Sequence, residues 1–125
     1  MNLLPIADYL EDGGFGSKSK SIFINQMPVN AKNAVLLRNP IEGTEIDHEL
    51  PGYYKTYFEM TVRSADYQKG EQKALEISQY MNVSDALIGD MSVKYLRPCN
   101  LPVAYPLSDG DLIEFRVKFD IAFVV

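Results

Sequence analysis

The chain has 125 residues, a length typical of one domain. Its 17 acidic residues outnumber its 12 basic ones, and the net charge of −5 argues against a protein that binds by neutralising phosphates. The single cysteine, Cys99, excludes an intrachain disulfide, and no apolar run approaches the ~20 residues of a membrane span. The N-terminus lacks the basic and apolar regions of a signal peptide, so we expect none.

The first third of the chain predicts one helix and two strands. The apolar spacing over residues 3–12 predicts a short amphipathic helix, and the glycine-rich segment 13–19 ends it as a flexible link. Residues 21–28 alternate as a strand, and the apolar run 34–38 is typical of a buried strand. The polar residues between these two strands predict a hairpin loop, and residues 39–43 carry a turn signal.

The middle of the chain holds a long irregular segment, a strand and a helix. Residues 43–54 are irregular and long for a connection, since most connections have about 4–6 residues. Residues 56–64 alternate cleanly and predict a strand. Residues 66–82 then predict an amphipathic helix whose N-terminal cap is Ser64 or Asp66.

The apolar stripe of this second helix contains a glycine. The stripe consists of Tyr67, Gly70, Ala74, Ile77 and Met81. A glycine inside a helix costs about 1 kcal/mol compared with alanine. Gly70 therefore marks either close packing against the sheet or a helix that begins later.

The last third of the chain predicts two more strands. Residues 83–90 predict a short turn or helical piece, and residues 91–96 alternate as a strand. The proline-rich segment 97–111 predicts an irregular connection that ends in a turn at 108–111. Residues 113–123 are apolar at every odd position and charged at all even positions but one. They predict a long antiparallel strand whose wet face is either ordinary solvated surface or a contact for a neighbouring subunit.

Together these elements predict an α+β fold. We expect a mainly antiparallel sheet with one long helix and a short N-terminal helix packed mostly on one face, as a single domain over residues 1–125. The core between sheet and helix combines alternating strand residues with the helix stripe. Its expected members are Phe58, Met60, Val62, Ala74, Ile77, Met81, Phe115, Val117, Phe119 and Ile121.

Signals for catalysis are weak, and we expect no catalytic residue, no metal and no cofactor. His48 is the only histidine, so a catalytic pair with Cys99 or a serine would have to use it. Residues 45–49 gather three carboxylates around that histidine and are the best metal candidate, with a solvated acidic loop as the alternative.

Two nucleic-acid interpretations also lack support. The glycine-rich segment GGFGSKSKS (13–21) does not match a phosphate-binding loop, because the spacing differs and the segment follows a helix. A ferredoxin-like RNA-binding module would stack bases on strand aromatics beside basic residues. Here Glu59 shares the strand face of Tyr57.

The remaining features suit a protein that works by assembly. Tyr53, Tyr54 and Tyr57 cluster after the irregular segment, and tyrosine is enriched at interfaces. The final strand and the proline-rich segment 97–108 offer further contact surfaces. Each has a plainer alternative: a surface loop, a packed core strand and a simple connector.

Four stretches of the sequence resemble one family of viral proteins. They are IADYLEDGGFG (6–16), IFINQMP (22–28), AVLL (34–37) and IDHELPGYYKTYFEMTVRSADYQKGEQKALEI (46–77). In order and spacing they resemble the tail terminator family, among the small minor capsid and tail-completion proteins of long-tailed bacteriophages. The resemblance covers roughly residues 3–82.

The resemblance implies a structural virion protein at the head–tail joint, assembled in the host cytoplasm. Such a protein forms a hexameric ring on the finished tail tube, ends its polymerisation and contacts the head-completion or connector protein. DNA passes through without specific binding, and no membrane and no catalysis are implied. The alternatives are another joint component, such as a head-completion or stopper protein, a small enzyme using His48, or a nucleic-acid-binding module with salt-dependent DNA affinity.

In this role, we expect the irregular segment 43–54 to form a contact in the assembly. The turn at Leu50-Pro51-Gly52 directs it, and we expect it to contact a neighbouring subunit or the tail tube. The expected interface residues are Asp47, Glu49, Leu50, Pro51, Tyr53, Tyr54 and Tyr57. Replacing Tyr53 and Tyr54 with alanine should weaken assembly but leave the monomer folded. We also expect acidic residues to outnumber basic ones along the lumen, where they would let DNA slide.

Overall fold

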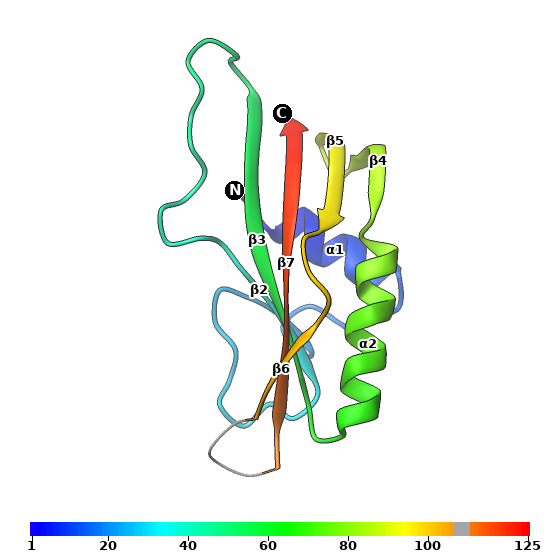
Figure 1. Cartoon of the computed structure of the whole chain (residues 1–125). Coiled ribbons are helices and arrows are strands. Elements are labelled where there is room, and N and C mark those ends of the chain that lie inside the picture. The colour runs from blue at the N-terminus through cyan, green and yellow to red at the C-terminus, as the bar shows by residue number, and fades with distance from the viewer. Residues whose placement is uncertain (107–110) are drawn as a thin grey trace.

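The computed structural model describes residues 1–106 and 111–125, which form two helices and a seven-stranded sheet (Figure 1). The strand order is β1-β2-β3-β7-β5-β4, with β6 beside β7. Every strand pair is antiparallel except β1 with β2. The elements are α1 (Leu4–Asp12), β1 (Ile22–Ile24), β2 (Ala34–Arg38), β3 (Tyr53–Ser64), α2 (Tyr67–Tyr80), β4 (Val83–Ile88), β5 (Met91–Pro98), β6 (Val103–Pro106) and β7 (Ile113–Val124). The predicted α+β class and the mainly antiparallel sheet are confirmed.

The pairing of β3 with β7 is the longest in the molecule. It runs without a break from Tyr53 opposite Val124 to Ser64 opposite Ile113. Because side chains alternate along each strand, directly opposite residues share one face of the sheet. Phe58 lies opposite Phe119 on the inner face, and their rings stack with centroids 5.4 Å apart. Two apolar rows therefore face the core together.

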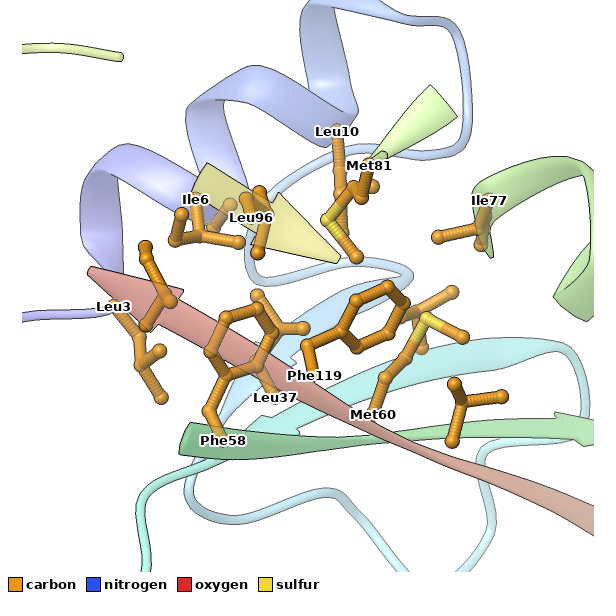
Figure 2. Packing of buried hydrophobic residues seen from close by; sticks show 14 of the residues in the cluster. Leu3, Ile6, Leu10, Leu37, Phe58, Met60, Ile77, Met81, Leu96 and Phe119 are labelled. Carbon is orange, nitrogen blue, oxygen red and sulfur yellow. The ribbon is translucent and has the colours of Figure 1, made fainter. Parts of the chain in front are cut away.

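Both helices cover this inner face. Figure 2 shows side chains of α1, of α2 and of the sheet pointing toward one another around Phe58 and Phe119. The two helices also touch, because the rings of Tyr9 and Tyr80 stack with centroids 4.4 Å apart. The ten residues expected in the core between sheet and helix are all buried. In the part of the chain that the structure describes, neither helix is long and apolar enough to cross a membrane.

Helix α2 begins at a defined cap. The carboxylate of Asp66 accepts a hydrogen bond of 3.0 Å from the backbone N–H of Lys69, and Ser64 supports the cap through its hydroxyl. Such a cap satisfies a backbone donor that the first turn leaves open. Tyr67, which we placed in the buried stripe, is instead 51% exposed. It lies in the first turn, where its ring meets Phe115 edge-on at 5.4 Å.

The hairpin predicted between residues 21–28 and 34–38 is wrong. Strand β1 ends at Ile24 and pairs parallel to β2, with Ile22 opposite Val35. Parallel strands need a crossover, and the chain leaves β1 through Asn25, whose φ of 63° turns it away from the strand direction. The polar segment 25–33 is that crossover, which periodicity alone cannot distinguish from a hairpin loop.

The turn or helical piece predicted at residues 83–90 is also wrong. Residues Val83–Ile88 form β4, which pairs antiparallel with β5 through a hairpin at Gly89 and Asp90. Gly89 has a φ of 61°, a conformation that favours glycine in two-residue hairpin loops. The exposed polar residues of this edge strand hid its alternation.

Two other boundaries differ from expectation. Strand β3 begins at Tyr53, so the tyrosines assigned to the loop belong to the sheet. The segment 97–111, expected to be irregular, contains the end of β5 and the short strand β6. Pro102, just before β6, and Pro106, its last residue, masked the strand in the sequence. The turn predicted at 108–111 falls largely on residues outside the described part.

Gly70 allows α2 to lie close to the sheet. A Cβ atom at this position would meet the ring of Phe115 at 2.5 Å and Cβ of Ser64 at 2.8 Å. Both partners are buried and cannot move aside without disturbing the core. Of the two interpretations of this glycine, close packing is the one that the structure shows.

The variant Gly70→Ala should therefore destabilise the fold by about 1–3 kcal/mol, although alanine is the better helix former. Urea unfolding of both proteins measures the difference. The exposed α2 variant Glu71→Ala is the control and should change stability by less than about 0.5 kcal/mol. A Gly70→Ala protein as stable as the wild type would contradict the close-packing explanation.

Candidate functional site

The face of the sheet opposite the helices is rich in cations, and we call it the outer face. Register places cations and carboxylates together in rows across β2, β3, β7 and β5. The cations are Arg38, Lys55, Arg63, Arg97, Arg116 and Lys118, and the carboxylates are Glu59, Glu114 and Asp120. This face therefore carries a positive balance on a chain whose net charge is −5.

One ion pair on the outer face is structural. Arg63 donates from Nε and Nη2 to the same oxygen of Glu114, at 3.2 and 3.0 Å. Its Nη1 also donates to the backbone carbonyls of Pro28, Val29 and Ala31. The pair is almost enclosed, with side-chain exposures of 12% and 9%. Arg63 thus fastens the crossover segment 25–33 to the sheet, and this explains why Glu114 is buried on a face predicted to be wet.

Three further cations lie over tyrosine rings. Lys118 lies 4.2 Å from the ring centre of Tyr57. The guanidinium groups of Arg97 and Arg116 lie 4.3 and 5.1 Å from the ring centres of Tyr95 and Tyr105, respectively. Such cation–π contacts hold a cation in place without using its N–H donors. The outer face therefore presents positioned cations that can still bind carboxylates.

The segment 39–52, which we call the acidic loop, runs beside the part of β3 that β2 does not cover (Figure 1). Its first half is anchored, because the N-terminal amine donates to the hydroxyl of Thr44 at 2.8 Å. Tyr57 donates a hydrogen bond of 2.7 Å to the carboxylate of Glu42. At the far end, the N–H of Tyr53 bonds to the carbonyl of Leu50. The loop therefore leaves the body in a fixed direction.

Every residue at the tip of the acidic loop, from 45 to 51, is exposed. It carries Glu45, Asp47 and Glu49 together with the exposed apolar side chains of Ile46 and Leu50. Four of the seven expected interface residues lie here: Asp47, Glu49, Leu50 and Pro51. Exposed apolar groups interleaved with charges are typical of protein contact surfaces.

The three tyrosines of the expected interface do not share one surface. Tyr53 and Tyr57 lie on the outer face, whereas Tyr54 lies on the inner face opposite Phe123. The Tyr54 and Phe123 rings are 5.4 Å apart. Tyr54 also lines an apolar cavity of about 250 Å³ near both chain ends. Its replacement would disturb the core as well as any contact.

Both candidates for chemistry, His48 and Cys99, are exposed. His48 lies in the exposed tip of the acidic loop. Partial burial and a hydrogen bond with Asp120 raise the pKa of the Cys99 thiol, whereas nucleophilic thiols have a lowered pKa. Among the described residues, no three His, Cys, Asp or Glu side chains lie close enough together to hold a metal ion.

Sequence reasoning missed the tyrosine–cation pairs of the outer face. Alternation does place Arg116 and Lys118 on one face of the last strand. Their partners Tyr105 and Tyr57 come from β6 and β3, however, and only the strand order and register bring them together. The Tyr95 and Arg97 pair, two residues apart on one strand, could have been found by extending the alternation of residues 91–96.

Comparisons with known proteins found one matching family and a similar solved structure. The sequence model of a family described as bacteriophage tail terminator protein matches residues 9–125. Among solved structures, a chain from the virion of a native gene transfer agent particle is similar, with a TM-score of 0.62 and 15% sequence identity. The alignment covers 95% of this chain and 86% of that chain, which shows a shared fold. No curated protein matches the sequence significantly.

The Arg63–Glu114 pair predicts a difference between two arginines that contact the same carboxylate. Arg63→Ala should cost about 3–5 kcal/mol, because it leaves a buried charge without its partner. Arg116→Ala should cost less than about 1 kcal/mol, because that side chain is 50% exposed and lies 3.4 Å from the nearest oxygen of Glu114. Denaturant unfolding measures both. Equal losses would show that enclosure of the Arg63 pair does not matter.

The hydrogen bond between Tyr57 and Glu42 predicts a shift in titration. A donated hydrogen bond stabilises the carboxylate, and accordingly the pKa of Glu42 is lowered by Tyr57. In Tyr57→Phe, the pKa of Glu42 should rise toward its ordinary value, as followed by NMR titration. Tyr53→Phe is the control and should leave that pKa unchanged. No rise in Tyr57→Phe would mean that the loop is not held by this contact.

Proposed function

This chain belongs to the bacteriophage tail terminator family and is a structural component of the phage tail and virion; we propose that it forms the ring that caps the tail tube. In this role it assembles in the host cytoplasm on the end of a finished tube, at the head–tail joint. It ends polymerisation of the tube protein and then contacts the head-completion or connector protein. The reaction is one of assembly, and no catalytic step belongs to it.

The observation that carries this proposal is the presence of two unlike surfaces on one chain. The acidic loop projects in a fixed direction, and the outer face presents positioned cations. Contact between unlike surfaces is heterologous, and such contacts generate a closed ring when the rotation between neighbours closes. A hexamer is the stoichiometry that the resemblance implies.

The charge of the chain supports passage of DNA through such a ring. With 17 acidic and 12 basic residues, the subunit repels a polyanion overall. The basic outer face would bind DNA if it lined the lumen, so we place it at a subunit contact and acidic side chains at the lumen. The lumen residues then neither hold DNA nor read its sequence.

The direct test is growth of tail tubes from purified tube protein in the presence of this chain. We expect the protein to stop elongation at about one ring per tube end, as counted by negative-stain imaging. Tubes that elongate normally at saturating protein would overturn the proposal. Binding to the head connector without any effect on tubes would instead assign the chain to another component of the joint.

Mutation of two neighbouring tyrosines should separate assembly from folding. Tyr53→Ala should leave unfolding nearly unchanged but raise the concentration needed to stop tube growth about tenfold, because Tyr53 faces outward beside the loop. Tyr54→Ala should lower stability by about 3 kcal/mol, because its ring packs on Phe123. Tyr53→Phe, which retains the ring, is the matched control. Normal capping by Tyr53→Ala would exclude this tyrosine from the contact.

A further inference from the structure

We infer that the tip of the acidic loop of one copy docks on the outer face of a second copy of this chain. Carboxylates of the tip would bind Arg97, Arg116 and Lys118 of the neighbouring copy. The inference rests on the proposed ring and names the surfaces that join its subunits. It commits to a second copy because both complementary surfaces are present on the same chain.

The receiving surface is arranged in advance. Each of the three cations is held over a tyrosine ring at 4.2 to 5.1 Å, and all three are exposed. A guanidinium group stacked on a ring still presents its N–H donors at its edge, where a carboxylate can bind two of them. Little side-chain entropy is then lost when the carboxylate arrives.

Among the described residues, the carboxylates at the tip of the acidic loop have no ion-pair partner on their own subunit. Contacts of Glu42, Thr44 and Leu50 hold the two ends of the acidic loop against its own subunit. Within the described residues, Glu45, Asp47 and Glu49 take part in no ion pair. Asp47 instead accepts the N–H of Glu49, which fixes the local turn. These carboxylates are exposed; they line a shallow pocket together with Tyr53 and Lys55 of their own β3, and they lie open to a second copy.

The apolar groups of the two surfaces also match. Ile46 and Leu50 alternate with the carboxylates of the tip, and they are 63% and 52% exposed. On the outer face, tyrosine rings alternate with the cations. A contact of this kind can bury rings and aliphatic groups between its ion pairs. That composition, aromatic and arginine-rich, is typical of the energetically dominant parts of interfaces.

The alternative of joining copies by strand addition at β6 is disfavoured. The N–H and the C=O of Lys118 in β7 both form hydrogen bonds on the side of β7 where β6 lies. Because the backbone N–H and C=O groups alternate in direction along a strand, those of Val103 point toward β7 and those of Ala104 point outward, away from the sheet. Pro102 and Pro106, which would share the outward direction of Ala104, have no N–H group. Prolines of this kind protect an exposed sheet edge from pairing, which disfavours strand addition at β6.

The test exchanges charges between the two surfaces. One variant carries Glu45→Lys and Glu49→Lys in the loop, and the other carries Arg116→Glu and Lys118→Glu on the outer face. Each variant alone should associate at least about tenfold more weakly than the wild type. An equimolar mixture should recover association, because each reversed surface meets its complement on the other variant. Light scattering and imaging are made on the free proteins and on proteins mixed with tail tubes.

Neutral variants test whether a loss of association arises from the missing charges and not from misfolding. Glu45→Gln, Asp47→Asn and Glu49→Gln together keep the shape of the loop, since the amide oxygen introduced at position 47 can still accept the backbone N–H of position 49. On the outer face, Arg97→Gln with Lys118→Gln removes two cations without adding repulsion. Both neutral variants should fold, as judged by circular dichroism, and should also lose about tenfold in association.

The outcomes separate this inference from the proposed function. Neutral variants that assemble like the wild type, or charge-exchanged variants whose mixture stays apart, would overturn the inference. A wild-type chain that remains monomeric, both free and on tubes, would overturn it as well. Tubes that still stop growing with the neutral variants would leave the terminator function in place. Charge-dependent rings that fail to stop tube growth would leave the contact in place but overturn the function.

Discussion

The twelve-residue pairing of β3 with β7 is the constraint on which the rest of the molecule depends. It sets one register for two long strands at the centre of the sheet. A slip of one residue in either strand would turn that strand's core side chains to the outer face and its outer-face cations toward the core. The same pairing therefore fixes both the apolar inner face, which stabilises the fold, and the charged outer face, which is the proposed interaction surface.

The periphery is fastened to this central pair by a small number of polar contacts. Arg63 joins β3 to Glu114 of β7 and to three carbonyls of the crossover segment. Tyr57 of β3 holds the acidic loop through Glu42, and Asp66, just after β3, caps α2. A protein that docks into a large assembly gains from such fastening, because little flexibility remains to be lost when it binds.

Whether a feature of this fold could be predicted from the sequence depends on how far apart in the chain the residues that determine it lie. Local signals held: the alternation of 113–123, the cap before α2 and the tight glycine at 70 were all visible along the chain. Features that depend on contacts between residues distant in sequence were not predicted correctly. The crossover after β1 and the burial of Glu114 are both set by Arg63, which lies far from each in sequence.

The same distinction applies to the candidate surface. The long irregular loop, its carboxylates and its tyrosines could be selected from the sequence, because length, charge and aromatic clustering are local properties. The side of the sheet that each tyrosine occupies required the start of β3 to be known. The cations held over rings required the strand order, because Lys118 and Arg116 meet tyrosines of other strands. An interaction surface on a sheet is thus a property of its register.

The central claim is that the outer face of the β3–β7 pair is a contact between subunits in a ring at the end of the tail tube. Electron cryomicroscopy of tubes capped by the purified chain tests it most directly. The account predicts a ring in which the acidic loop of each subunit covers the outer face of the next, with Arg97, Arg116 and Lys118 at the contact. A ring whose outer faces are open to solvent or line the lumen would contradict it.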